Sequence, residues 1–118
     1  MDGSVFEKVV SSEQRLREVL GHPGERAVGK EQRRLDKHCR AFIAQSPFLI
    51  LGTANAAGQC DVSPKGDEPG FIRVEDPRTL LIPERVGNNL AFGLSNILAT
   101  GKIGLIALVP ATGETLRV

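Results

Sequence analysis

The stretch "FLILGTANAAGQCDVSPKGD", residues 48–67, decides the fold of this 118-residue chain. "FLILGT" is a short apolar run bounded by turn residues, which is typical of a buried strand. "ANAAG" has the composition of a hairpin loop, and "QCDVS" is typical of the returning strand. The stretch therefore predicts an antiparallel hairpin followed by a stiff loop, "SPKGD", that carries Lys65.

Further short strands follow this hairpin along the chain. The runs are "FIRV" (71–74), "TLLIP" (79–83), "KIGLIALV" (102–109) and "ETLRV" (114–118), with the turn "EDPR" between the first two. One helix interrupts them in "GNNLAFGLSNILAT" (87–100), where asparagines stand at the expected helix start. Short strands at hairpin spacing with one inserted helix predict a small antiparallel barrel.

The first 45 residues have helical periodicity instead. Apolar residues recur at helical spacing from Val5 to Leu20, and Ser11 with Gln14 resembles a capping box at which a helix restarts. "GHPG" at 21–24 ends this pattern, and a second helix is expected from Glu31 until "SP" at 46–47. The expected class is α+β: a helical segment, residues 1–45, packs on a split barrel, residues 46–118.

Composition excludes several classes of protein. The net charge is +1 and the aromatic residues are five phenylalanines, so neither a basic patch nor a base-stacking stripe for nucleic acid is expected. The longest apolar run is far shorter than the ~20 residues of a membrane span, and the N-terminus has no secretory pattern. Two cysteines make no disulfide framework, which predicts a cytoplasmic protein with reduced thiols.

The sequence also lacks several common catalytic motifs. It has two histidines, His22 and His38, and no set of ligands at zinc spacing, so no metal site is expected. "GLSNI" lacks the second glycine of a nucleophile elbow, and no dinucleotide-binding or P-loop motif occurs. Thus neither a triad hydrolase nor a nucleotide-binding fold of the usual kind is indicated.

Two loops keep a functional interpretation. "SPKGD" offers a hydroxyl, the Lys65 ammonium and a glycine N–H. "ERVGNN" (84–89) ends where a helix is expected to begin, so its N–H groups and the helix dipole would attract an anion such as a phosphate. The alternative is structural: Asn88 is a helix cap and Lys65 a solvated turn residue.

From about Arg40 to Val118 the chain resembles the pyridoxamine 5′-phosphate oxidase-like superfamily of FMN-binding split β-barrels, and within it a bacterial branch of probable FMN-dependent proteins. Three segments carry the resemblance: "SPFLILGTANAAGQCDVSPKGDEPGF", "RTLLIPERVGNNLAFGLSNIL" and "VPATGETLRV". It implies FMN as cofactor and oxidoreductase chemistry on an unknown substrate.

The resemblance also implies which positions contact the cofactor. The strand that closes on the family's lysine lies along the flavin, a second strand passes its ring, and the next loop binds its phosphate. A polar residue on the last strand contacts the ring from beyond. The matching residues here are Cys60, Asp61, Val62, Ser63, Pro64 and Lys65; Ile82 and Pro83; Arg85, Gly87, Asn88 and Asn89; and Thr115 or Arg117.

The sequence departs from pyridoxamine phosphate oxidases at cationic positions. Those enzymes have an arginine where Cys60 stands and an Arg-Lys pair where Asn88 and Asn89 stand. Pyridoxamine phosphate is therefore not the expected substrate, and no catalytic acid or base is assigned. Two alternatives stay open: a non-catalytic module that stores flavin or another cofactor such as haem, and a cofactor-free structural subunit.

The resemblance further implies a homodimer with FMN at the interface. "ETLRV" stops in mid-pattern where family members continue through further strands, so a chain truncated at its C-terminal end is expected. Open strand edges would then favour pairing with a second copy.

Overall fold

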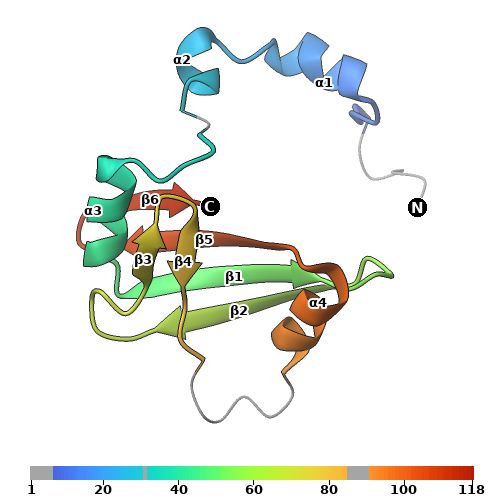
Figure 1. The fold of residues 1–118 in the computed structure, drawn as a ribbon. Helices are drawn as coiled ribbons and strands as arrows, with labels where there is room; N and C mark the ends of the chain where they lie inside the picture. Colours follow the sequence, from blue (N-terminus) through green and yellow to red (C-terminus); the bar gives the residue numbers. More distant parts are fainter. Residues whose placement is uncertain (1–6, 31, 85–90) are drawn as a thin grey trace. The chain divides into compact units, whose positions relative to one another are not determined.

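The computed structural model describes residues 7–30, 32–84 and 91–118. Its contacts divide the chain into two compact units, residues 1–32 and residues 33–118. Figure 1 shows the elements of both units. Every strand among the described residues belongs to the second unit.

The first unit holds two short helices, α1 (Glu13–Leu20) and α2 (Glu25–Val28). The Ser12 hydroxyl accepts a 3.0 Å hydrogen bond from the Arg15 N–H, so the cap is Ser12 and the prediction of Ser11 was wrong by one residue. Of the helical turns expected before it, residues 7–12 are not helical, and Val9 and Val10 are exposed, without packing to support a helix. Val5 and Phe6 lie outside the described residues. Neither helix has a buried residue, and the packing of this segment on the sheet stays a prediction.

A four-stranded antiparallel sheet forms the centre of the second unit. It contains β1 (Phe48–Ala54), β2 (Cys60–Gly66), β5 (Ile103–Val109) and β6 (Glu114–Arg117) in the order β2-β1-β5-β6. In the loop between β1 and β2, the Asn55 side chain accepts hydrogen bonds from the N–H groups of Ala57 and Gln59. The hairpin predicted from residues 48–63 is therefore confirmed.

A separate hairpin of β3 (Arg73–Asp76) and β4 (Thr79–Leu81) completes the strands. Within the described residues no strand ladder joins this hairpin to the larger sheet. The fold is thus mixed α+β with antiparallel sheets, as expected. A closed barrel is not shown by the described strands, because closure would require the hydrogen-bonded ladder to continue around the sheet.

Two helices accompany the sheets, and both begin later than expected. Helix α3 (Lys37–Gln45) begins after Asp36, whose carboxylate accepts a 2.8 Å hydrogen bond from the Cys39 N–H. Helix α4 (Phe92–Thr100) begins after Ala91, which has a left-handed φ of 52°. The asparagines of "GNN", at which the sequence predicted this start, lie outside the described residues.

The core lies on one face of the larger sheet. It consists of Ile43, Leu49, Leu51, Ile72, Leu105 and Ala107. The Asn96 amide donates a 3.0 Å hydrogen bond to the Thr53 hydroxyl, and this bond fixes α4 over β1 on that face. Among the described residues, no helix has both the length and the apolar character needed to cross a lipid bilayer.

Candidate functional site

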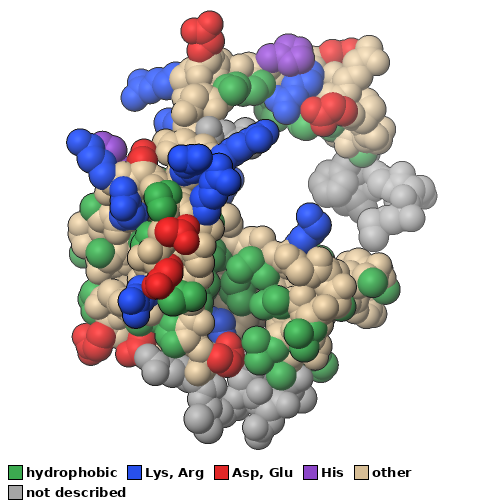
Figure 2. Space-filling view, in the orientation of Figure 1, with side chains coloured by type: hydrophobic (Ala, Val, Ile, Leu, Met, Phe, Trp, Pro, Cys, Tyr) green, Lys and Arg blue, Asp and Glu red, His purple; other side chains and the backbone are tan. Residues whose placement is uncertain are grey.

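A pocket of about 370 Å³ opens between strand β2, the segment that follows β4, and helix α4. Figure 2 shows hydrophobic side chains gathered in the region of the sheet beside α4. The lining residues are Leu51, Asp61, Val62, Ser63, Pro64, Lys65, Leu80, Ile82, Glu84, Phe92, Gly93, Leu94, Ile97 and Ile103. Most of this wall is apolar, and its polar groups come mainly from β2 and Glu84.

Strand β2 gives the pocket its polar wall. Ser63 pairs with Leu51 and Lys65 with Leu49, so these polar side chains share the core face of the sheet. The sequence placed Pro64 and Lys65 in a loop after the strand, which was wrong: they continue the strand. Pro64 is tolerated there because β2 is an edge strand, where a missing N–H removes no ladder bond on the outer side.

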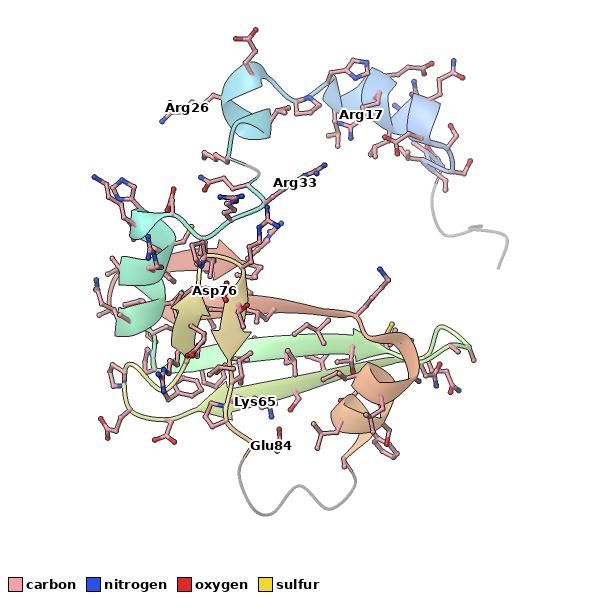
Figure 3. The ribbon with its side chains drawn as sticks, in the orientation of Figure 1. Arg17, Arg26, Arg33, Lys65, Asp76 and Glu84 are labelled. Atoms are coloured by element: carbon pink, nitrogen blue, oxygen red, sulfur yellow. The ribbon has the colours of Figure 1, made fainter. Side chains whose placement is uncertain are left out.

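Lys65 forms an ion pair at the edge of the pocket. Its Nζ lies 2.9 Å from Oε2 of Glu84, and the two side chains are 16% and 35% exposed. Figure 3 shows the two side chains meeting between β2 and the segment after β4. The ammonium is thus neither a solvated turn residue nor free to serve as an uncompensated cation.

A second carboxylate lies at the first turn of α4. Oδ2 of Asp61 is 3.7 Å from the position that a β-carbon on Gly93 would take. The partial positive charge at the start of a helix favours a nearby anion, and here the chain supplies one itself. The described lining therefore contains two carboxylates, Asp61 and Glu84, and one cation, Lys65.

The structure brings together only some of the residues that the resemblance implied. Asp61, Val62, Ser63, Pro64, Lys65 and Ile82 line the pocket, whereas Cys60 and Pro83 lie next to lining residues in the chain. The four phosphate-binding candidates, Arg85, Gly87, Asn88 and Asn89, lie outside the described residues.

Thr115 and Arg117 lie on the other face of the sheet. They pair with Leu108 and Ile106, which pair in turn with Phe48 and Ile50. Residues that pair directly share a face, so this set is opposite to the face of Leu51 and Lys65. Contact of Thr115 or Arg117 with a cofactor stays a prediction.

Sequence reasoning missed Glu84 and the whole α4 wall of the pocket. Glu84 opens the motif "ERVGNN", and its charge, opposite to that of Lys65, was the available signal. Leu94 and Ile97 stand at helical spacing in the sequence, which is typical of the core face of an ordinary helix. Phe92 and Leu94 are in fact exposed, so they form a pocket wall and not a core.

A family model described as pyridoxamine 5′-phosphate oxidase matches residues 35–118 of the chain. The chain belongs to this family. The match begins just before α3 and ends at Val118, so it includes both sheets and every described lining residue of the pocket. The expected family is therefore confirmed, and flavin is the cofactor that this family commonly binds.

A solved structure from Group A Streptococcus, the H111A form of HupZ, is similar in fold. The TM-score is 0.52 at 20% sequence identity, and the match covers 70% of this chain and 64% of that chain. At this identity the likeness supports the split-barrel fold alone. A comparison with curated proteins found no match.

The pocket fits the ring of a flavin better than its phosphate. Its volume lies within the ~300–1,000 Å³ range of small-molecule sites, and its apolar walls suit a flat heteroaromatic ring. A phosphate monoester carries about −1.5 to −2 charges, and the two carboxylates of the described lining oppose it. In the described part of the chain, no group of three His, Cys, Asp or Glu side chains could hold a metal ion.

Proposed function

We propose that this protein binds FMN in the pocket beside α4 and works as an FMN-dependent oxidoreductase on a small substrate. The observation that carries the proposal is the pocket itself, which has apolar walls with Lys65 at its edge. It lies in a chain of a family that commonly binds flavin. When bound, the flavin supplies the redox chemistry, and the protein supplies position and electrostatics.

The chain's own residues have distinct tasks in this proposal. Leu80, Ile82 and Leu94 exclude water from the ring and hold it between β4 and α4. The Lys65 ammonium has three N–H donors, so it can bond a ring acceptor while it stays paired with Glu84. A positive group at the polar edge of the ring stabilises negative charge that develops there.

The alternative is a carrier that holds flavin or haem without turnover. A haem iron needs an axial ligand such as His, Cys, Met or Tyr, and none of these is among the described lining residues. Because the described lining lacks an axial ligand, it favours flavin over haem. Anaerobic mixing with reduced nicotinamide cofactors separates enzyme from carrier, because bleaching of the flavin is expected for the oxidoreductase and no response for the carrier.

We also propose a homodimer with FMN at its interface. The implied cofactor residues are split between two faces of one sheet, with Lys65 on one face and Thr115 and Arg117 on the other. A second copy can bring its own Thr115 or Arg117 to the same cofactor, which a single sheet cannot do. The second face is apolar where Phe48, Ile50, Ile106 and Leu108 lie half-buried, as an interface core would be.

The visible spectrum of the purified protein is the first test. Flavin absorption, with FMN identified after release by heat, is the expected result. A colourless protein that does not take up FMN in a reconstitution titration contradicts the proposal, and a haem spectrum would favour the carrier.

A matched pair of variants locates the site. Leu94→Trp fills the pocket and is expected to weaken FMN binding. Leu98→Trp is the control. Leu98 follows one turn later on α4, lies outside the pocket lining and is 89% exposed. Equal FMN affinity in the two variants would place the cofactor elsewhere.

Light scattering tests the assembly at micromolar concentration. A specific two-fold dimer should bury at least ~1,000 Å² in total. Arg117→Glu on the shared face should then lower FMN affinity. A folded monomer that binds FMN stoichiometrically would contradict the shared site.

A further inference from the structure

Glu84 has no role in the function proposed so far, although it is the partner of the single cation in the described pocket lining. We propose that Glu84 is a positioning residue: it holds the Lys65 ammonium at the ring edge of the flavin and keeps it from serving as the counter-ion of the phosphate. This inference rests on the proposed function and deepens it, because it states which part of the cofactor Lys65 recognises.

The geometry supplies the first step. Lys65 belongs to β2 of the larger sheet, and Glu84 follows β4 of the separate hairpin, so their 2.9 Å contact links two sheets that share no ladder. A lysine side chain is long and flexible and normally extends its charge to water. Only 16% of the Lys65 side chain is exposed, which means that Glu84 holds it against the pocket wall.

Charge balance supplies the second step. The Lys65 ammonium is already compensated, and Asp61 adds a further carboxylate beside the first turn of α4. A phosphate approaching Lys65 would have to displace Glu84, whose tether gives it a high effective concentration, and would meet Asp61 nearby. The uncharged acceptors of a flavin ring meet no such competition, since Lys65 has N–H donors left after bonding Glu84.

The proposed position of Lys65 predicts that neutralising Glu84 and neutralising Lys65 shift the midpoint potential of the flavin in opposite directions. Removing the Glu84 charge leaves Lys65 uncompensated, which should stabilise the reduced, anionic flavin and raise its midpoint potential. Removing the Lys65 charge takes a positive group away from the ring edge, which should lower the potential. A merely structural ion pair would not give shifts of opposite sign.

The binding test compares FMN with riboflavin, which has the same ring without the phosphate. Lys65→Met should weaken the binding of both ligands by the same factor, about ten- to one-hundredfold for a charge-assisted hydrogen bond. Glu84→Gln should leave the ratio of FMN to riboflavin affinity unchanged, because the neutral amide oxygen still accepts a hydrogen bond from the Lys65 ammonium and keeps it at the ring edge. The control is Glu75→Gln, which removes the same charge from the exposed Arg73–Glu75 pair and should change neither ligand's affinity.

The outcomes separate the two proposals. If wild-type protein binds neither FMN nor riboflavin, the proposed function is wrong and the inference fails with it. If FMN binds, but Lys65→Met weakens FMN alone and spares riboflavin, then Lys65 bonds the phosphate and only the inference is overturned. Potentials that do not move, or that move in the same direction in Glu84→Gln and Lys65→Met, overturn it as well.

Discussion

The Asn96 amide on α4 donates a 3.0 Å hydrogen bond to the Thr53 hydroxyl on β1, and both side chains are buried. This bond attaches to the sheet the helix that forms one wall of the pocket. Substitutions at either residue should therefore change both the stability of the fold and the shape of the site.

Breaking this buried pair from one side should be costly. Thr53→Val leaves the Asn96 amide without its acceptor in a buried site, which should cost about 1–3 kcal/mol in the free energy of unfolding. Urea denaturation followed by far-UV circular dichroism measures this value. The double variant Thr53→Val with Asn96→Leu should lose less than the sum of the single losses, because no polar group is then left unpaired. If the losses in unfolding free energy of the two single variants simply add in the double variant, Thr53 and Asn96 are not energetically coupled.

The Lys65–Glu84 pair should stabilise the fold more than an exposed ion pair. Glu84→Gln should lower the free energy of unfolding by roughly 1–2 kcal/mol, between the values for exposed and fully buried pairs. Glu75→Gln, in the exposed Arg73–Glu75 pair, should cost less than about 0.5 kcal/mol. Equal losses in the free energy of unfolding for Glu84→Gln and Glu75→Gln would mean that placing the ion pair at the pocket adds no stability.

The two cysteines should react with thiol reagents at different rates. Burial, together with the side-chain hydrogen bond between the Cys39 thiol and Asp36, raises the pKa of the Cys39 thiol, so less of it is thiolate at neutral pH. The sequence places Cys60 in a strand, where a thiol usually packs as a small hydrophobic residue, and predicts that neither cysteine is a redox catalyst. In the structure Cys60 is exposed at the start of edge strand β2. A colorimetric thiol assay should show a fast phase that Cys60→Ser removes and Cys39→Ser leaves. Loss of FMN-dependent activity in step with the fast phase would contradict our expectation that neither thiol is a redox catalyst.

Asp76 should make the β3–β4 hairpin sensitive to acid. A hydrogen bond from the Arg78 N–H, 2.8 Å long, lowers the pKa of the Asp76 carboxyl, and a side-chain hydrogen bond from Thr79 adds to this shift. Because the folded pKa is below the unfolded value, the carboxylate stabilises the fold above the unfolded pKa of 3.8, and this stabilisation is lost as pH falls through the folded pKa. Wild type should therefore exceed Asp76→Asn in melting temperature at neutral pH, with the difference disappearing in acid. If the difference in melting temperature between wild type and Asp76→Asn does not change with pH, the charge of Asp76 is not its cause.

The strands could be predicted from the sequence because their signal is local. The continuous apolar run in "KIGLIALV" and the turn residues around "FLILGT" already indicate which segments extend and where the chain reverses, and β1, β2 and β5 agree with them. Helix starts were harder. The prediction missed the starts of α1, α3 and α4 because several cap residues stand close together, and packing decides which of them is used.

By itself the sequence determined the class of the fold, the β1–β2 hairpin and the family. Each of these depends on neighbours in the chain or on the order of motifs along it. The tertiary structure alone decided that Lys65 meets Glu84, that Asp61 lies at the first turn of α4, and that Arg117 lies on the opposite face. These contacts join residues distant in sequence through strand register and sheet packing, and no local pattern encodes such distances.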